Sequence, residues 1–172
     1  TANSGYTPLK RRIAAARYMS LQRNLAKKNN VEVRAMKKVV LISCVSKKEN
    51  KVCSAEKMYI SPLYKMNLKY AKLFNPDDIF ILSAKYGLLE LNREIEPYNE
   101  TLNDKGKREV EKWAEEVYKQ LSEKFDINNT QFIFLASDKY RKYLLPKLKH
   151  YEIPMNGLTI GKQLQFLKEK TR

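Results

Sequence analysis

The sequence predicts a three-layer α/β domain built on a mostly parallel central sheet. Short, continuous hydrophobic runs recur along the chain at residues 39–42, 79–82 and 132–135. Such runs are typical of strands that are buried on both faces of a parallel sheet. Amphipathic helical periods separate the runs, which gives the order β-α-β-α-β-α with right-handed crossovers.

A basic helix is predicted before the first strand. Thr7 has the character of an N-cap, Pro8 suits the first helical position, and no further glycine or proline occurs up to Lys28. We therefore expect residues 1–35 to form a basic helical N-terminal arm and residues 36–172 to form the α/β domain. The sequence leaves open whether the first segment is a separate arm, a tag or a neighbour's helix.

Helix signals follow in the order that this fold requires. Ser61 and Pro62 begin a helix with one apolar face, and a second helix has the clearest period of the chain. The first face consists of Leu63, Met66, Tyr70 and Leu73, and the second of Val110, Trp113, Ala114, Val117 and Leu121. The tryptophan is therefore predicted to lie in the core. Asp138 is placed to cap a helix that Pro146 interrupts, and Thr159 to cap the last helix.

The charge of the chain predicts a polyanionic partner. Lys and Arg number 34 against 19 Asp and Glu, a net charge of +15 on a chain that is 43% hydrophobic. This apolar share excludes a disordered basic tail, and the apolar runs are too short to span a bilayer, so no membrane association is expected. DNA or RNA is the commonest such partner, because neutralising phosphates releases counterions. The alternative is a surface that is merely soluble.

Basic residues of the arm and of the last helix are the candidates for contact with DNA. The first 36 residues carry eight Lys and Arg and a single Glu. Backbone N–H groups at the start of a helix also favour phosphate. The candidates are Arg11, Arg12, Arg23 and Lys27 of the arm and Lys162 of the last helix.

Neither a metal centre nor a cofactor is predicted. His150 is the only histidine, and Cys44 and Cys53 have no histidine nearby, which argues against a zinc site. No glycine-rich phosphate loop follows the first strand, which argues against a nucleotide triphosphatase or a dinucleotide enzyme. Two cysteines that need not be paired fit a reducing cytosol, and no secretion signal is recognised, so a cytoplasmic location is expected.

Polar segments follow each of the predicted strands. In an open parallel sheet, ligands bind beyond the carboxyl ends of the strands. The segments at these ends are residues 43–48, 83–89 and 137–140. The second leads into residues 95–102, a stretch without helical or strand period, and long loops in compact domains are often functional. We therefore expect a ligand site at this edge of the sheet.

The same segments resemble a known family. The motifs are Cys-Val-Ser-Lys-Lys at 44–48, Ser-Ala-Lys-Tyr-Gly-Leu at 83–88, Pro-Tyr-Asn-Glu-Thr-Leu at 97–102 and Gly-Leu-Thr-Ile-Gly-Lys at 157–162. Over residues 38–167 the chain looks like the YaaA-related family of bacteria and phages, whose fold is similar to that of uracil-DNA glycosylases. The histidine-bearing motif of ordinary uracil-DNA glycosylases is not part of the resemblance, so their catalytic residues are not carried over.

The resemblance implies a uracil-DNA-glycosylase-like α/β fold. Members of the family range from DNA-binding stress proteins to relatives of RNA-base-modifying domains. Some glycosylase-like members act in phage defence by removing modified bases. The resemblance therefore implies a protein that acts on, or binds, nucleic-acid bases.

The strand-end segments supply groups that suit an extruded base. A glycosylase takes the nucleotide out of the stack and holds its base by stacking and by edge hydrogen bonds. Tyr86 and Tyr98 are candidates for stacking, and Asn99 for reading the base edge. The remaining members of the predicted substrate-binding set are Cys44, Ser46, Lys48 and Gly87. Half-buried packing explains the tyrosines equally well. Cys44 could also be a nucleophile, but without a histidine partner a small buried thiol is the favoured interpretation, and the alternative for Gly87 is a turn.

Hydrolysis of an N-glycosidic bond also needs a carboxylate that orients or deprotonates water. Asp138 is the first candidate, and its alternative role is that of a helix N-cap. Glu96 and Glu100 are the next candidates. Lys85 is a candidate for stabilising the departing base, for contacting phosphate, or for forming a Schiff base with the sugar.

The function expected from these residues and from the resemblance is that of a DNA glycosylase. It would hydrolyse the N-glycosidic bond of a modified or noncanonical base flipped out of duplex DNA, leaving an abasic site, in defence against phages with modified DNA. One alternative is a noncatalytic, YaaA-like DNA-binding stress protein. Another is a transferase that modifies bases in RNA.

Overall fold

The computed structural model describes residues 13, 15–21 and 36–172, and its contacts divide the chain between Met36 and Lys37. The two parts are described separately. In the first part, residues 13 and 15–21 are helical, within the predicted helix. The helix start at Thr7 and the predicted DNA contacts Arg11, Arg12, Arg23 and Lys27 lie outside the described residues.

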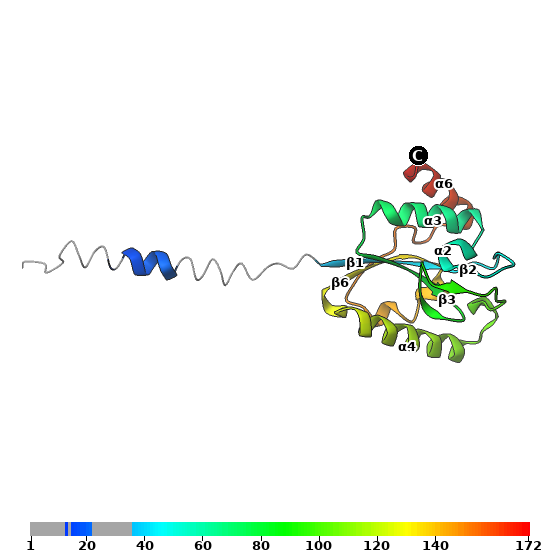
Figure 1. Ribbon diagram of the computed structural model, residues 1–172, viewed down its shortest axis with the longest axis horizontal. Coiled ribbons are helices and arrows are strands. Elements are labelled where there is room, and N and C mark those ends of the chain that lie inside the picture. Colours follow the sequence, from blue (N-terminus) through cyan, green and yellow to red (C-terminus); the bar gives the residue numbers. More distant parts are fainter. Residues whose placement is uncertain (1–12, 14, 22–35) are drawn as a thin grey trace, which may run out of the picture. The chain divides into compact units, whose positions relative to one another are not determined.

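The second part is built on a five-stranded sheet in the order β4-β3-β1-β6-β7 (Figure 1). The strands are β1 (Lys37–Ser43), β3 (Asp78–Ser83), β4 (Gly87–Glu90), β6 (Thr130–Leu135) and β7 (His150–Glu152). β1 pairs in parallel with β3 and β6, and β6 pairs in parallel with β7. Only β4 is antiparallel in this sheet, alongside β3. The predicted mostly parallel sheet is confirmed.

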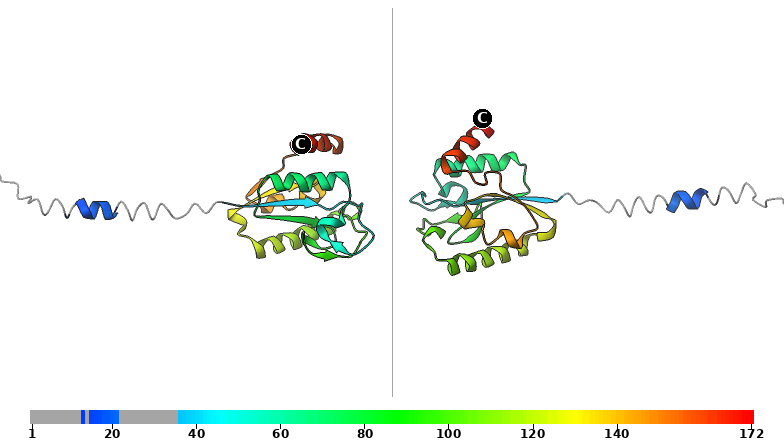
Figure 2. Two further views of the ribbon diagram at one scale, coloured as in Figure 1. Left: turned by 45° about the horizontal axis from the view of Figure 1, so that its top comes forward. Right: turned by 180° about the vertical axis from the view of Figure 1, so that it is seen from behind.

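Helices cover both faces of the sheet, which gives an α/β fold in layers (Figures 1 and 2). The helices α3 (Pro62–Leu73) and α6 (Ile160–Lys170) lie on one face, and α4 (Lys107–Lys124) lies on the other. Ser61 caps α3 as predicted, because its side chain accepts a hydrogen bond from the Tyr64 N–H. The chain therefore runs from β1 to β3 across one face and from β3 to β6 across the other.

Short elements fill the connections. A two-stranded antiparallel ribbon joins β2 (Cys53–Ser54) to β5 (Glu94–Ile95). The other short elements are α2 (Ala55–Met58), η1 (Leu102–Asp104), η2 (Ile127–Asn129), α5 (Asp138–Arg141) and η3 (Leu145–Lys147). In the described part of the chain, no helix is both long enough and apolar enough to cross a membrane.

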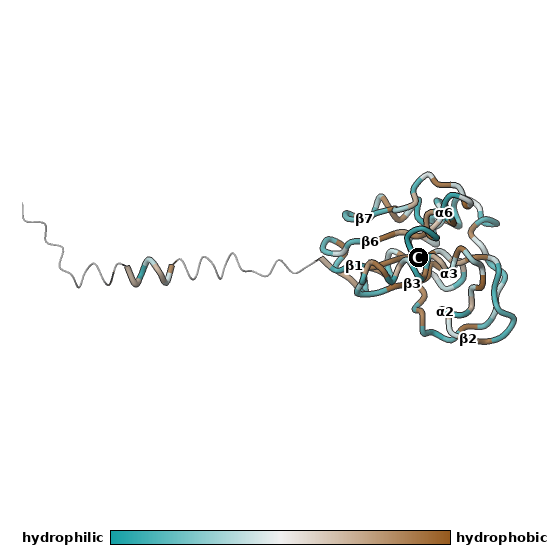
Figure 3. The backbone as a smooth tube through the Cα atoms, turned by 90° about the horizontal axis from the view of Figure 1, so that it is seen from above, coloured by the Kyte–Doolittle hydropathy of each residue, from teal (hydrophilic) through white to brown (hydrophobic). Residues whose placement is uncertain are grey.

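The core lies between the sheet and its helices, and hydrophobic residues concentrate along β1 and β6 (Figure 3). On α4 the buried residues are Val110, Ala114, Val117 and Leu121, as the helical period predicts. Trp113 is half-buried rather than fully buried. The predicted core position of this tryptophan is therefore correct only in part.

The apolar face predicted for α3 is displaced by about one residue. The buried positions are Tyr64, Asn67 and Ala71, whereas Leu73 is 59% exposed. The reason is that α3 has two neighbours, the sheet and α6. The Tyr70 ring of the predicted stripe packs edge-on against Phe166 of α6, with ring centroids 5.6 Å apart. A polar residue, Asn67, therefore occupies the buried stripe.

One local expectation from the sequence is wrong: Ser137, not Asp138, is the N-cap of α5, and Asp138 is the first residue of that helix. One strand was not predicted: residues 87–90, most of which belong to the polar segment after the second predicted strand, form the edge strand β4. The left-handed backbone of Gly87, with φ of +70°, turns the chain back so that Leu88 and Leu89 pair with β3.

Candidate functional site

The polar segments that follow β1, β3 and β6 converge at one edge of the sheet. The three strands are parallel neighbours, so their carboxyl ends meet there. The Cys44 N–H donates to the Leu82 carbonyl at 3.0 Å, which ties the end of β1 to the end of β3. Because the connections from β1 and from β3 leave on opposite faces, this edge is the topological switch point where open α/β sheets bind ligands.

A cavity of about 420 Å³ opens at this switch point, and we call it the edge cavity. The ends of β1 and β6, the helices α3 and α6, and residues 101–104 all contribute to its walls. Its lining includes Cys44, Ser46, Asn67, Asp104, Tyr140 and Gln163. Cavities of this size accommodate small ligands or single heterocyclic groups.

A rigid hydrogen-bonded wall backs the edge cavity. The Tyr140 hydroxyl accepts from the Cys44 thiol at 3.2 Å and from the Leu102 N–H at 3.3 Å. The Tyr140 ring packs edge-on against Trp113, with centroids 5.6 Å apart. Trp113 in turn donates its indole N–H to the Ser83 carbonyl at 2.8 Å. These contacts fix the ends of all three strands relative to one another.

Ser83 organises the loop after β3 from a fully buried position. Its hydroxyl oxygen accepts from the Lys85 and Tyr86 N–H groups at 3.2 and 3.0 Å. The same oxygen lies 2.7 Å from the Tyr98 hydroxyl, which lies 2.5 Å from the Tyr59 hydroxyl. A chain of hydroxyl groups therefore connects the loop after β3 with the segment before α3.

The rings of Tyr86 and Tyr98 pack against protein groups. They contact each other edge-on, with centroids 5.5 Å apart. Lys48 Nζ lies 4.5 Å from the Tyr98 centroid, and the Arg93 guanidinium lies 4.8 Å from the Tyr86 centroid. The packing interpretation therefore describes both tyrosines in this structure, and stacking on a base stays a prediction.

Burial changes the proton affinity of this cluster. It raises the pKa of Tyr59, Tyr98 and Tyr140, with a further contribution from the neighbouring Cys44. Burial also lowers the pKa of Lys48, an effect that Cys44 opposes. The tyrosine hydroxyls therefore act as neutral hydrogen-bonding groups.

These raised pKa values predict a loss of stability at alkaline pH. Below the ordinary tyrosine pKa of about 10 their contribution to stability is complete. Above it, the unfolded chain releases protons that the folded chain retains, so the free energy of unfolding falls as pH rises. The ionisation of the 11 tyrosines can be followed by absorbance as the pH is raised. We expect Tyr59, Tyr98 and Tyr140 to ionise only when the chain unfolds. Ordinary ionisation of all tyrosines in a chain that is still folded would contradict this.

Two further cavities each measure about 490 Å³; the first shares lining residues with the edge cavity, and the second shares Lys105 with the first. The Asp138 cavity is lined by Asp138 and by Lys105, Lys107, Lys139 and Lys142, and it shares Asn103 and Ser137 with the edge cavity. The Lys85 cavity is lined by Lys85, Tyr86, Gly87, Lys105, Lys112 and Trp113, among others. The carboxyl edge of the sheet thus carries adjoining hollows with many lysines.

The predicted site residues are divided among these hollows. Cys44 and Ser46 line the edge cavity, and Asp138 lines the Asp138 cavity. Lys85, Tyr86 and Gly87 line the Lys85 cavity. Glu96, Glu100 and Asn99 are exposed on the loop after β5 and line none of the three. Lys48 is half-buried, and Lys162 is exposed on α6. Lys85, Tyr98, Asn99 and Asp138 therefore do not share one cavity.

The glycine of the predicted set has a structural role. The φ of +70° at Gly87 is strained for any residue with a side chain, and a Cβ there would displace the Gln120 amide, whose oxygen accepts from the Leu88 N–H at 2.8 Å. The turn interpretation therefore describes Gly87 in this structure, and close approach to a base stays a prediction.

Sequence reasoning missed several residues of the edge cavity, notably Asn67, Asp104 and Gln163. Asn67 is 5% exposed, and its Oδ1 has no hydrogen-bond partner among the described residues. The one available signal was the spacing of Asn67 from Tyr64 and Ala71, three and four residues away on a helix. The neighbouring stripe of Leu63, Met66, Tyr70 and Leu73 is the stronger apolar pattern, so the sequence alone does not single out Asn67.

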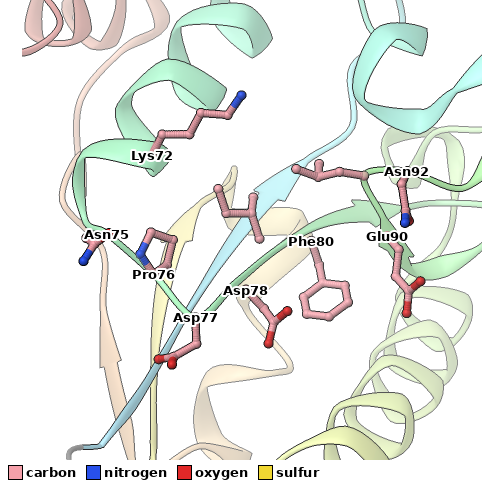
Figure 4. Close-up of a pocket in the computed structure, with 10 residues that line it drawn as sticks. Lys72, Asn75, Pro76, Asp77, Asp78, Phe80, Glu90 and Asn92 are labelled. Carbon is pink, nitrogen blue, oxygen red and sulfur yellow. The ribbon is translucent and has the colours of Figure 1, made fainter.

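A larger cavity, of about 590 Å³, lies at the opposite end of β3 (Figure 4). Asp77, Asp78 and Glu90 line it. Asp77 accepts from the Lys38 N–H at 2.7 Å, and Glu90 pairs with Lys124 at 2.8 Å. Because this cavity faces away from the strand carboxyl ends, its size does not make it the stronger candidate.

The described part of the chain has neither a cluster of metal ligands nor a disulfide bond. Residues 13, 15–21 and 36–172 contain no group of three or more His, Cys, Asp or Glu side chains placed to hold a metal ion. Cys44 and Cys53, both described, are free thiols.

Comparison with known proteins identifies a family. No curated protein and no solved structure matches the chain. A family model, described as a family of unknown function (DUF6884), matches residues 39–169, which covers every wall of the edge cavity and all of the five-stranded sheet except the first two residues of β1. The chain therefore belongs to the DUF6884 family.

Proposed function

We propose that this protein is a DNA glycosylase that holds a modified or noncanonical base in the edge cavity and hydrolyses its N-glycosidic bond. The observation that carries the proposal is the edge cavity itself, which lies at the switch point with a carboxylate, Asp104, and a buried amide, Asn67, in its lining. The helix–sheet–helix layers are compatible with the uracil-DNA-glycosylase-like fold that the resemblance to YaaA-related proteins implies.

Two carboxylates are placed to serve the reaction. Asp104 lines the edge cavity and Asp138 lines the adjoining one, and both cavities share Asn103 and Ser137. With the base in the edge cavity, the sugar would lie near the shared residues. One carboxylate would take a proton from water as the water oxygen bonds to the sugar C1′. The base would leave with the electron pair of the broken C1′–N bond and take up a proton from solvent, and the carboxylate would then return its proton to solvent.

Lysines beside these carboxylates support a phosphate backbone as the partner. Lys105, Lys107, Lys139 and Lys142 line the Asp138 cavity. Residues 37–172 carry 26 Lys and Arg against 18 Asp and Glu, so this part is basic without the N-terminal segment. Neutralising several phosphates would give affinity that falls steeply with salt.

We further propose that the protein acts in the cytoplasm against phages with modified DNA. Free thiols at Cys44 and Cys53 are compatible with a reducing compartment. The defence role is proposed because glycosylase-like members of the YaaA-related family, which the chain resembles, act in phage defence. The lysines at the carboxyl edge of the sheet would form the surface that contacts duplex DNA.

Base release tests the proposal directly. The full chain is incubated with plain DNA, with DNA from several phages that carry modified bases, and with structured RNA, and free bases are measured by mass spectrometry. We expect one modified DNA to release its base and to gain an equal number of abasic sites. Salt-sensitive binding without any released base would instead identify a noncatalytic binder. Release or exchange of a base only from RNA would identify the RNA-modifying alternative.

A further inference from the structure

Three cations gather on the touching rings of Tyr86 and Tyr98. Lys48 Nζ lies 4.5 Å from the Tyr98 centroid, and Lys85 Nζ lies 5.3 Å from the Tyr86 centroid and 5.9 Å from that of Tyr98. The Arg93 guanidinium lies 4.8 Å from the Tyr86 centroid. Lys48, Lys85 and Arg93, which we call the cation cluster, therefore place three positive charges around one tyrosine pair.

The cation cluster is assembled from three separate segments. Lys48 lies between β1 and β2, Lys85 in the turn between β3 and β4, and Arg93 between β4 and β5. Cation–π attraction to the rings offsets part of the repulsion among the like charges. Tyr98 is anchored in turn, because its hydroxyl lies 2.7 Å from the Ser83 hydroxyl oxygen. The fold therefore brings the three charges together on a fixed support.

No carboxylate neutralises the cation cluster. Within residues 13, 15–21 and 36–172, no carboxylate oxygen lies within 4 Å of any of its three charged groups. Lys124, which pairs with Glu90 at 2.8 Å, is the main cause of the lowered pKa of Glu90, and Arg93 is a minor one. Lys48 is also half-buried, and a partly buried charge without a counter-ion is unfavourable. This arrangement favours an anionic ligand.

Lys147 shows the opposite case. Its Nζ lies 5.3 Å from the Tyr118 centroid, the same distance that separates Lys85 from Tyr86. The Lys147 Nζ also pairs with Glu115 at 2.6 Å, so its charge is neutralised within the protein. Lys85 and Lys147 therefore form a matched pair that differs in the carboxylate.

Shared lining residues link the cation cluster to the edge cavity in steps. Lys85 belongs to the cluster and also lines the Lys85 cavity, which shares Lys105 with the Asp138 cavity. The Asp138 cavity shares Asn103 and Ser137 with the edge cavity. A polyanion with charges repeated along its length, as in a nucleic-acid strand, is suited to such an extended series of cations.

We infer that the cation cluster is a second phosphate-binding surface for the backbone of DNA. The inference rests on the proposed function only in taking DNA as the partner, and it does not require the edge cavity to be catalytic. Tyrosine rings interleaved with cations suit nucleic acid better than an acidic peptide, because bases pack on aromatic rings while cations meet phosphates. The planar guanidinium of Arg93 would contact two phosphate oxygens at once.

The salt dependence of DNA binding tests the inference. Affinities of the full chain, the single variants Lys48→Gln, Lys85→Gln and Arg93→Gln, and the triple variant are measured by fluorescence anisotropy on two unrelated duplexes. Each lost phosphate contact should reduce the slope of log affinity against log salt by about 1, so the triple variant should lose about 2 to 3. The loss should be equal on both duplexes, because phosphates carry no sequence information. Lys147→Gln removes the same charge and should keep the wild-type slope.

The outcomes separate this inference from the proposed function. An unchanged slope for the triple variant, or equal losses for Lys85→Gln and Lys147→Gln, would overturn the inference, while base release from DNA would still support the glycosylase. A reduced slope without base release from any DNA would uphold the inference and contradict the glycosylase. Polyglutamate that binds the wild-type protein more tightly than DNA does, and the triple variant more weakly, would assign the cluster to an acidic polypeptide and overturn the inference. Should the triple variant fail to fold, Lys85→Gln and Arg93→Gln, both at exposed positions, carry the same test.

Discussion

Replacing Asp104 with asparagine is expected to slow base release by about 10²- to 10⁴-fold while DNA binding persists. Asp104 is the carboxylate that lines the edge cavity itself. Its loss removes the group that would accept a proton from the attacking water, whereas the lysines that line the Asp138 cavity would still be available to contact phosphate. Single-turnover release measured by mass spectrometry, alongside binding measured by fluorescence anisotropy, separates the two effects.

Asp138→Asn and Asp78→Asn complete the series. Asp138 lines the Asp138 cavity. If Asp138→Asn loses more turnover than Asp104→Asn, Asp138 and not Asp104 is the carboxylate that takes the proton from water. Asp78 lies at the opposite end of β3, and its substitution should leave turnover unchanged. If Asp104→Asn keeps more than a tenth of wild-type turnover, Asp104 does not take part in the reaction.

Replacing Ser83 with alanine is expected to lower the free energy of unfolding by about 2 to 4 kcal/mol. The Ser83 hydroxyl accepts from two backbone N–H groups and bonds the Tyr98 hydroxyl, and the residue is 0% exposed. Alanine leaves those groups without their partner, because water does not reach the site. Urea denaturation at neutral pH measures the change.

Ser122→Ala is the matched control for this serine. Ser122 is exposed, and its hydroxyl makes a single bond to the Tyr118 carbonyl on the same helix. Its loss should change the free energy of unfolding by no more than about 0.5 kcal/mol. Equal effects of the two substitutions would contradict the role assigned to Ser83 in holding the loop after β3.

The strands could be predicted because continuous hydrophobic runs have few alternatives to burial in a parallel sheet. The runs at 39–42, 79–82 and 132–135 became β1, β3 and β6, and parallel pairing placed their polar ends together. Strand β4 escaped prediction because its four residues depend on the turn at Gly87 and on pairing with β3. Such pairing is a tertiary contact, which a local pattern does not encode.

The sequence predicts where the edge cavity lies, at the carboxyl ends of the strands, but not which helix residues line it. Cys44 and Ser46 were expected there, because they follow β1 directly. Asn67 and Gln163 come from helices whose rotation depends on packing, and α3 turns a face toward the sheet that differs from its apolar stripe. Asn99 was a candidate for reading the base edge and Glu96 for acting on water, but the exposure of both side chains became clear only in three dimensions.

The proposed function is tested most directly by a crystal structure of the Asp104→Asn protein with duplex DNA that contains the base released by the wild-type protein. We expect this base to be turned out of the duplex into the edge cavity, within hydrogen-bonding distance of Asn67, with flanking phosphates against Lys105 or Lys139. A base held instead between Lys85 and Trp113, or a bound duplex with every base still stacked, would contradict it.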